Sequence, residues 1–315
     1  METEILIVAN PAARSGKAEQ VASSVYQKIK CHFSGSAVRL AFTKRNNEAT
    51  DITRKAMANH TSLIIAVGGD GTINEVVNGF FENGKLLNPA CELGLINCGT
   101  GGGYAKTLNI PQSLDQQIEL ILQAGSVKLD VGCITYQDSW GITCKRFFVN
   151  ECQLGIGSKV AALVGKKYKM LGAPVAFGLM AMIQAMRAET LRLTISYDDE
   201  SPQTQPLIGL VVGNGVECAG GMKLTPDATL TDGFFDVLSI YPMSIAERLL
   251  TLSKVYSGTH VNSPRLAVRK CKKLAINAST AVAIEADGEM LGTAPFQIEV
   301  LPMLINVKAA YYPAN

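Results

Sequence analysis

The sequence predicts an α/β N-terminal domain with a mostly parallel sheet, followed by a β-rich C-terminal domain built as an antiparallel sandwich. Up to Gln123, short apolar runs of strand length alternate with stretches of helical periodicity, which is typical of βαβ units. After Val127, apolar runs follow one another with short turns between them, which favours antiparallel sheets. The 315 residues are enough for two ordinary domains. We place the boundary so that residues 1–130 form the first domain and 131–295 the second.

The N-terminal strands and helices alternate along the chain. The expected strands are 3–9, 37–42, 62–67 and 91–97. The expected helices are 18–30, 47–59, 73–81, 104–108 and 113–123. Right-handed connections bring the turns after successive parallel strands to the carboxyl edge of the sheet. We therefore expect four residues that follow strands to meet there: Asn10, Thr43, Asp70 and Thr100.

The C-terminal half is expected to be mostly strands. The apolar runs are 127–135, 145–152, 190–197, 206–213, 234–240, 265–270, 273–277, 281–286 and 296–301. Helical stretches are expected at about 158–187 and 243–256. Runs this close together, without alternating helices, indicate a sandwich or a barrel.

The glycine-rich stretch Val67–Glu75 lies where a buried strand is followed by a helix. Glycine lets a ligand approach the backbone, and a helix start offers free N–H groups and positive dipole charge, which suit a phosphate. Thr72 and Glu75 have the spacing of a capping box, which would fix the helix start. Asp70 would then be a carboxylate in an anion-binding turn, which requires a bridging cation such as Mg²⁺. The alternative is a tight turn without a ligand.

Composition excludes several classes. The net charge of +2 gives no electrostatic footprint for nucleic acid. The eight cysteines show no C-x-x-C pair, which is typical of reduced thiols in an intracellular protein. The N-terminus has no basic region of a signal peptide. We expect a cytoplasmic protein.

One apolar segment, 170–186, contains seventeen uncharged residues. A membrane-spanning helix needs about 20, and this segment contains Gly172 and Pro174. We expect a helix that is either buried in a domain or in contact with a membrane surface through this segment and the lysines before it. Those lysines are Lys166, Lys167 and Lys169.

Five motifs together resemble the soluble bacterial diacylglycerol kinase and sphingosine kinase family. The first three are Asn10-Pro11, the stretch 68–75 (GGDGTINE) and the stretch 95–101 (LINCGTG). The last two are 223–236 (KLTPDATLTDGFFD) and 285–289 (EADGE). The glycine–aspartate motif alone is shared with NAD kinases, whereas its combination with the late Asp-Gly-Glu is much more specific.

The resemblance implies that the first domain holds ATP, that the second holds lipid, and that the final strands, about 296–315, return to the first domain. It assigns nucleotide contacts to Asn10, Pro11, Ala12, Ala13, Arg14, Thr43, Gly69, Asp70, Gly71, Thr72, Ile73, Asn74, Glu75 and Thr100. It assigns catalysis to Glu289 as general base, with Asp287 beside it, and to Asp70. It assigns a structural Mg²⁺ to Asp232 and the backbone carbonyls of Thr229 and Phe234.

Two positions differ from the family pattern. Gly102-Gly103 replace a polar pair that usually follows Gly-Thr-Gly. Lys159 follows the segment in which sphingosine kinases place an aspartate for the substrate amine, which counts against an aminoalcohol lipid.

The sequence thus predicts an ATP- and Mg²⁺-dependent lipid kinase that transfers the γ-phosphoryl group to a lipid hydroxyl. Phosphoryl transfer requires a fixed nucleotide, a cation on the phosphates and a group that deprotonates the acceptor. The acceptor is expected to be diacylglycerol-like or sphingoid/ceramide-like, and to be met at the membrane surface by a cytoplasmic protein. A homodimer is left open, and no nucleic-acid partner is expected. The alternatives are an NAD-kinase-like enzyme and a non-catalytic lipid- or nucleotide-binding regulator.

Overall fold

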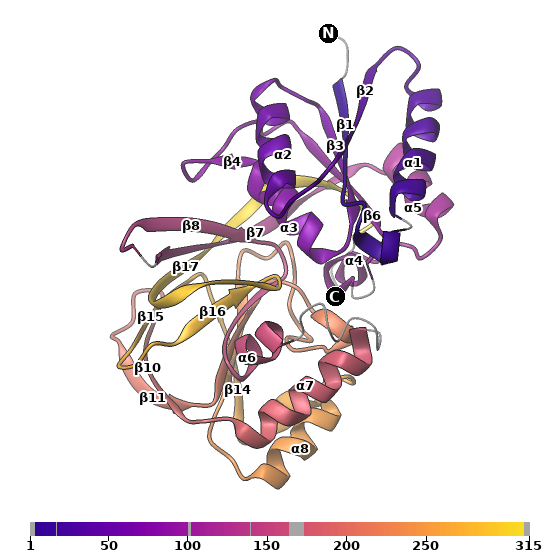
Figure 1. The fold of residues 1–315 in the computed structure, drawn as a ribbon. Helices are drawn as coiled ribbons and strands as arrows, with labels where there is room; N and C mark the ends of the chain where they lie inside the picture. The colour runs from indigo at the N-terminus through magenta and orange to yellow at the C-terminus, as the bar shows by residue number, and fades with distance from the viewer. Residues whose placement is uncertain (1–3, 17, 100–101, 139, 164–172, 312–315) are drawn as a thin grey trace. The chain divides into compact units, whose positions relative to one another are not determined.

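The computed structural model of the chain describes residues 4–16, 18–99, 102–138, 140–163 and 173–311. The chain divides into two compact units (Figure 1). Unit 1 contains Met1–Leu129 and Met303–Asn315, and unit 2 contains Asp130–Pro302. The last strand, β17 (Glu289–Lys308), therefore contributes residues to both units.

Unit 1 contains a parallel sheet. Its strands are β1 (Glu4–Ala9), β2 (Ala37–Phe42), β3 (Leu63–Gly68), β6 (Glu92–Asn97) and the end of β17. Their order in the sheet is β17-β6-β3-β1-β2, and all four pairings are parallel. Because residues of β17 pair with β6 at Asn306 and Val307, a strand from the end of the sequence completes the first unit.

Helices cover both faces of this sheet (Figure 1). They are α1 (Ala18–His32), α2 (Glu48–Ala58), α3 (Asp70–Gly79), α4 (Gly103–Thr107) and α5 (Leu114–Gln123). Alternate residues of β1 and β3, such as Ile7 and Ile65, pack with Val25 of α1 and Ile121 of α5. The residues between them, such as Val8, are also buried. Burial on both faces explains why these strands are continuous apolar runs. A small hairpin, β4 (Phe81–Glu82) and β5 (Lys85–Leu86), follows α3.

Unit 2 is mostly antiparallel sheet. Its strands, besides β17, are β7 (Ser126–Gln137), β8 (Thr143–Phe148), β9 (Glu151–Gly155), β10 (Leu191–Tyr197), β11 (Gln203–Leu207), β12 (Gly209–Gly213), β13 (Phe235–Ile240), β14 (Leu266–Cys271), β15 (Lys273–Ala278) and β16 (Ala283–Ala286). One run is ordered β14-β13-β12-β9-β16-β17, and a second joins β11, β10 and β15 to β17. The predicted fold class, a parallel α/β domain followed by an antiparallel β-rich domain, is confirmed.

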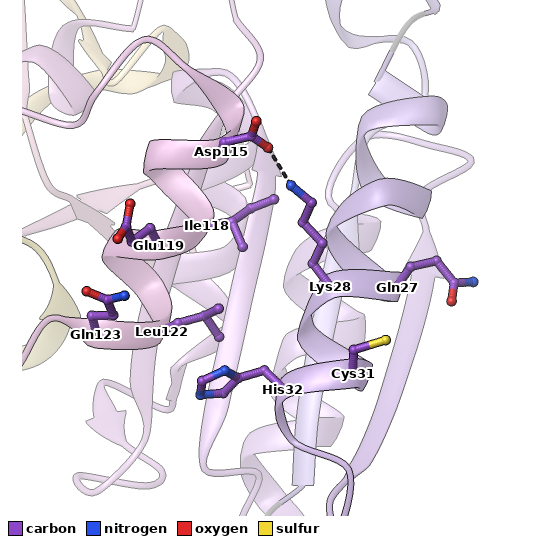
Figure 2. A pocket seen from close by; sticks show the side chains of 9 residues that line it. All are labelled: Gln27, Lys28, Cys31, His32, Asp115, Ile118, Glu119, Leu122 and Gln123. Carbon is purple, nitrogen blue, oxygen red and sulfur yellow. Dashed lines mark hydrogen bonds and ion pairs between the residues drawn. The ribbon is translucent and has the colours of Figure 1, made fainter.

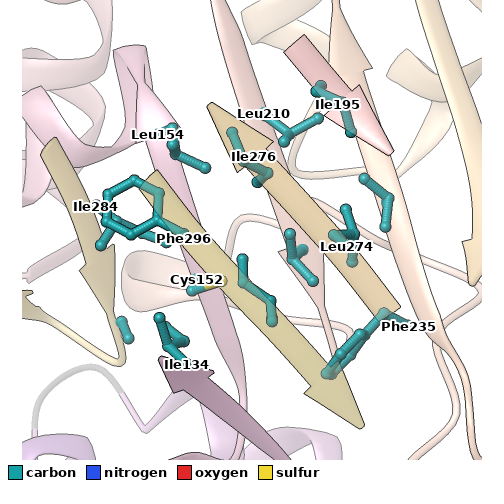
Figure 3. Close-up of a cluster of buried hydrophobic side chains, with 14 of the residues drawn as sticks. Ile134, Cys152, Leu154, Ile195, Leu210, Phe235, Leu274, Ile276, Ile284 and Phe296 are labelled. Atoms are coloured by element: carbon teal, nitrogen blue, oxygen red, sulfur yellow. The ribbon is translucent and has the colours of Figure 1, made fainter. Parts of the chain in front are cut away.

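The core of unit 2 lies between these strands (Figure 3). Leu154, Leu210 and Ile284 come from three adjacent strands of the first run, and Ile276 and Phe296 come from β15 and β17. Phe148 and Phe235 stack with ring centroids 5.5 Å apart. The hydrophobic effect of burying these side chains holds the two runs together.

The helical stretch expected at about 158–187 contains α6 (Ile156–Leu163) and α7 (Ala173–Arg187), and residues 164–172 between them lie outside the described residues. A third helix, α8 (Ile245–Lys254), packs near α7. Residues 170–172 and the three lysines of the expected membrane contact, Lys166, Lys167 and Lys169, lie outside the described residues.

Helix α7 is buried on one side and exposed on the other, and contact with a membrane stays a prediction. Met180, Ala181 and Ala185 are buried. Val175, Leu179, Met182 and Met186 are exposed at helical spacing. Within the described residues, no helix has both the length and the apolar character needed to cross a membrane.

Candidate active site

The carboxyl edge of the parallel sheet in unit 1 carries the predicted nucleotide site. The Asn10 N–H donates to the Val67 carbonyl (3.2 Å), and the Thr43 N–H donates to the Ala9 carbonyl (2.9 Å). The structure therefore brings Asn10, Thr43 and the turn after Val67 to one edge, because their strands are adjacent and parallel. Thr100 lies outside the described residues.

The loop after β1 is shaped by Asn10. Its side-chain oxygen accepts the Ala12 N–H (3.0 Å), and its carbonyl accepts the Ala13 N–H (3.1 Å). A short 3₁₀ helix, Ala13–Gly16, follows, and it includes Arg14. Of the predicted contacts in this loop, Ala12 is exposed, while Asn10 and Pro11 are partly exposed.

Helix α3 begins two residues before the predicted capping box. Its N-cap is Gly69, and no side chain caps it, so the capping-box prediction is wrong. Glu75 instead accepts the Ala49 N–H at the start of α2 (3.2 Å). Thr72, Ile73 and Asn74 are buried. Their side chains belong to the packing of unit 1, so only their backbone groups remain for a ligand.

Two glycine segments touch at this edge. A Cβ added to Gly99 would lie 2.6 Å from the Gly69 Cα, and one added to Gly68 would lie 2.3 Å from the Thr72 hydroxyl oxygen. Both glycines are therefore required by packing. Gly71 differs, because a Cβ there would meet no heavy atom within 4 Å among the described residues outside its own stretch of helix. The open space beside Gly71, in the first turn of α3, is suited to a phosphate group.

Asp70 joins the two glycine segments. Its carboxylate accepts the N–H groups of Gly103 (3.1 Å) and Tyr104 (3.3 Å). Burial raises the pKa of Asp70 above its ordinary value, and these backbone N–H groups oppose the rise. A carboxylate has about four acceptor positions, so two N–H donors leave capacity for a cation.

The structure explains why glycine, in place of a polar residue, occupies position 102. Gly102 has φ +59°, and a Cβ there would lie 2.4 Å from the Asn97 Nδ2. Gly103 follows as the first residue of α4, whose N–H binds Asp70. The glycine at 102 therefore fits a left-handed backbone packed against a side chain.

The Asp-Gly-Glu motif of unit 2 is a tight hairpin turn. Asp287 (φ +45°) and Gly288 (φ +90°) connect β16 to β17, with Ala286 paired to Glu289. Positive φ at both turn residues is typical of a type I′ turn. The Asp287 carboxylate accepts the N–H groups of Val149 (2.8 Å), Asn150 (3.1 Å) and Glu151 (3.0 Å). We therefore assign Asp287 a positioning role in place of the predicted catalytic one, because its oxygens hold the β8–β9 connection.

Glu289, the predicted base, is about one-third exposed and forms an ion pair with Arg146 of β8. The pairing with this guanidinium is a charge-assisted hydrogen bond, which fixes the orientation of the carboxylate. Arg146 was not identified from the sequence, because the two partners are 143 positions apart and leave no local pattern.

Glu285 was also missed. Glu285 is 1 % exposed, one carboxyl oxygen accepts the Gly288 N–H, and the other has no hydrogen-bond partner among the described residues. Burial, with the nearby Asp287 charge, raises the pKa of Glu285 from 4.5 to about 8. Between these values the folded protein keeps a proton that the unfolded chain releases, so the contribution of Glu285 to stability is full below pH 4.5 and is lost as the pH rises through 8.

The predicted structural Mg²⁺ site disagrees with the contacts of Asp232. One carboxylate oxygen accepts the Phe234 N–H (3.0 Å), and the other pairs with the Lys270 ammonium (2.5 Å). Lys270 also lies 3.8 Å from an oxygen of the buried Asp236. In the described part of the chain, no group of three metal-ligating side chains occurs. The Asp232 carboxylate, as it is paired here, therefore does not fit a divalent ion, because a lysine already supplies the cation.

A groove of about 600 Å³ lies between α1 and α5 (Figure 2). It is lined by the second half of α1, including Lys28 and His32, and by Asp115 and Leu122 of α5. Lys28 and Asp115 form an exposed ion pair beside it. None of the predicted site residues lines this groove, and we assign it no part in the site.

The glycine turn of the parallel α/β unit and the antiparallel β-rich unit together define a two-domain kinase. Residues 4–134 match the diacylglycerol kinase catalytic domain, and residues 151–309 match the YegS C-terminal NAD kinase beta sandwich-like domain. The chain belongs to the diacylglycerol kinase family. It is an enzyme of the kinase class, with an alcohol group as the phosphate acceptor.

Curated relatives match over nearly the whole chain. A diacylglycerol kinase of Staphylococcus aureus (strain bovine RF122 / ET3-1) is 29% identical over 309 residues, which cover 98% of this chain and 93% of the relative. A diacylglycerol kinase of Staphylococcus saprophyticus is 27% identical over 296 residues, covering 94% and 92%.

Solved structures share the fold. A candidate diacylglycerol kinase from Bacillus anthracis has a TM-score of 0.79 at 23% identity, covering 99% of this chain and 97% of its own. Yeast NADH kinase complexed with NADH has a TM-score of 0.54 at 11% identity, covering 98% and 83%. At these identities the likeness concerns the fold alone.

Proposed function

We propose that this protein transfers the γ-phosphoryl group of ATP to the free hydroxyl of diacylglycerol. The names of the curated relatives support this acceptor, and Lys159, where an aminoalcohol kinase would carry an acid, supports a lipid without an amine. ATP binds at the carboxyl edge of the parallel sheet in unit 1, and the lipid is bound by unit 2. The enzyme is cytoplasmic and meets its substrate at a membrane surface.

The observation that carries the nucleotide half of the proposal is the open space at Gly71. A Cβ added to Gly68 or Gly99 would collide with other protein atoms. Gly71 is exposed, and a Cβ added there would collide with no described residue. Packing therefore does not explain a glycine at this position, but the approach of a phosphate does. Backbone N–H groups of the first turn of α3 bind that phosphate, assisted by the helix dipole.

Mg²⁺ is proposed to arrive with ATP, and Asp70 is the residue that holds it. The remaining acceptor capacity of the Asp70 carboxylate fits a hard cation that prefers oxygen ligands. The ion would supply neutralisation of phosphate charge during transfer. Asp70 also fixes the glycine segment around Gly103, so its two functions are coupled.

Glu289 is proposed as the general base that takes the proton of the lipid hydroxyl. Arg146 pairs with its carboxylate, and Asp287 fixes the turn from which Glu289 projects. General-base catalysis of this kind contributes roughly 10²- to 10⁴-fold to the rate.

A soluble dinucleotide is the second candidate acceptor, since yeast NADH kinase shares the fold. A single assay distinguishes the two candidate acceptors. Labelled ATP is incubated with the enzyme and, in parallel samples, with short-chain diacylglycerol, sphingosine, ceramide or NAD⁺. We expect label in the phosphorylated diacylglycerol. Label only in phosphorylated NAD would support the second candidate, and label only in sphingosine or ceramide would contradict the proposed acceptor.

A further inference from the structure

The tip of the β7–β8 hairpin in unit 2 presents two large apolar side chains to solvent. Trp140 is 85% exposed and Ile142 is 60% exposed. Trp140 is the only tryptophan of the chain. The active site described above does not use either residue. Two such side chains next to each other on a hairpin tip are more than the scattered exposed residues that folded proteins usually show.

The turn that carries them is held by hydrogen bonds. One oxygen of the Asp138 carboxylate accepts the N–H groups of both Trp140 and Ile142, each at 2.9 Å. The Asp138 N–H donates to the Ile142 carbonyl, and the Gly141 N–H donates to the Asp138 carbonyl, both at 3.0 Å. Gly141 has φ +76°, which glycine adopts without strain. These bonds tie Trp140, Gly141 and Ile142 to Asp138, which lowers the entropy cost of a contact made by the two apolar side chains.

The size of the tip argues against a protein partner or a second copy of this chain. A tryptophan offers about 150–250 Å², so with isoleucine the tip offers roughly 400 Å² at most. A stable protein interface needs about 800 Å² from each partner. A bilayer has no such threshold, because each inserted apolar side chain contributes independently. Tryptophan in particular is enriched at membrane interfaces, where its ring is buried and its N–H stays hydrated.

The charge distribution along the hairpin also fits a bilayer. From Asp138 to Thr143 there is no lysine or arginine, and the Asp138 carboxylate accepts backbone N–H groups. The exposed Lys145 follows on β8, three residues and therefore about 10 Å behind Ile142. Apolar anchors enter a membrane by about 5–10 Å. With the tip at that depth, the Lys145 ammonium is at the level of the lipid phosphates.

We propose that Trp140 and Ile142 insert into the lipid interface and dock unit 2 on the membrane that contains the substrate. This inference rests on the proposed function, because a diacylglycerol kinase must take its substrate from a bilayer. It names a docking surface that is separate from the exposed face of α7.

The single tryptophan makes the test direct. Vesicles of phosphatidylcholine containing diacylglycerol are added to the wild-type protein, and tryptophan emission is recorded. We expect a blue shift, and quenching by phosphatidylcholine brominated on its acyl chains. Unchanged emission while the protein co-sediments with the vesicles would overturn the proposal, as would a failure to sediment. A blue shift that grows with protein concentration without vesicles would mean that the tip contacts a second copy, which also overturns it.

Variants then measure the contribution of the tip. Trp140→Ser and Ile142→Ser are each expected to lower vesicle partitioning, the first by at least about tenfold. Ile142→Ser keeps the fluorescent reporter. Leu250→Ser on α8 is the matched control, because Leu250 is also 60% exposed, and it is expected to bind as the wild type does. Equal partitioning of Trp140→Ser and wild type, at equal thermal stability, would refute the docking role.

A second readout separates this proposal from the proposed function. With a short-chain diacylglycerol dispersed as monomers, Trp140→Ser is expected to keep the wild-type kcat, whereas its rate on vesicles falls. If the wild type phosphorylates monomeric diacylglycerol but its tryptophan never enters the bilayer, docking is overturned and the function stands. If the tryptophan enters the bilayer but no diacylglycerol is phosphorylated, the docking surface stands and the function is overturned.

Discussion

Replacing Gly71 with alanine tests whether the open space at the start of α3 belongs to a ligand. Outside the local helix backbone, no heavy atom of the described residues lies within 4 Å of the added Cβ, and Gly71 has no positive φ, so the folded protein accepts the methyl group without strain. Alanine is favoured over glycine in a helix by roughly 0.5–1 kcal/mol. We therefore expect thermal stability to be unchanged or slightly raised.

The affinity for ATP is expected to change in the opposite direction. A methyl group placed in a filled contact costs about 1–3 kcal/mol, which corresponds to an increase in Kd of roughly 5- to 150-fold. Titration calorimetry with a non-hydrolysable ATP analogue and Mg²⁺ measures this increase directly. Wild-type affinity in Gly71→Ala would refute the reasoning, because the phosphate would then not approach this glycine.

Two other glycines of unit 1 are matched controls. A Cβ added to Gly125 also has no described heavy atom within 4 Å, so Gly125→Ala is expected to leave both stability and ATP affinity unchanged. Gly99→Ala would place its Cβ 2.6 Å from the Gly69 Cα, and backbone cannot yield at that distance as a flexible side chain does. We expect a loss of stability of about 1–3 kcal/mol in thermal or urea unfolding. Equal stability of Gly99→Ala and Gly71→Ala would contradict the packing described here.

Four further changes test the other groups. Asp70→Asn, which removes the charge and one acceptor oxygen, is expected to lower kcat by at least ~10² in a labelled-ATP assay; normal turnover would exclude a metal-linked role. Glu289→Gln should lower lipid phosphorylation by roughly 10²- to 10⁴-fold while calorimetric ATP affinity is kept; a parallel loss of affinity would indicate a structural role. Glu285→Gln removes a buried carboxyl that must ionise at high pH. In urea unfolding the variant should be more stable than wild type above pH 8, by on the order of a few kcal/mol, and nearly equal to it at pH 4.5. A constant difference in stability at all pH values would exclude this titration. Lys270→Met leaves Asp232 without its cation, so its Tm should rise on addition of Mg²⁺ or Ca²⁺, whereas a chelator should not lower the wild-type Tm.

Much of unit 1 could be predicted because its determinants are local. The runs of β1 and β3 are apolar throughout since both sheet faces are covered, and the residues that follow them, Asn10 and Asp70, necessarily lie at the same edge. The turn chemistry of Asp287-Gly288 is also visible in the sequence as a two-residue hairpin signal.

What could not be predicted depends on contacts between distant residues. The start of α3 is fixed by Gly69 and by the bonds of Asp70 to the 103–104 backbone, and these override the local capping pattern at Thr72. Lys270 and Asp232 are 38 positions apart. In the sequence Asp232 therefore resembled a metal ligand, because the lysine that pairs with it could not be identified. Long-range pairs of this kind leave no periodic signal.

The pairing of Glu289 with Arg146 and the burial of Glu285 have the same origin. Glu285 is buried because antiparallel pairing brings β16 against β9 and β17. Arg146 reaches Glu289 because β8 pairs with β7, and β7 pairs with β17. A sequence pattern identifies strands of this kind but does not give their neighbours.

Transfer of the γ-phosphoryl group of ATP to the hydroxyl of diacylglycerol, as proposed, can be observed directly. Phosphorus NMR of the wild-type enzyme with ATP, Mg²⁺ and a short-chain diacylglycerol follows every phosphorus species at once. We expect a phosphomonoester resonance that grows at the same rate as ADP, and no growth when the hydroxyl is acetylated. Release of inorganic phosphate alone, or ATP that remains unchanged, would contradict it.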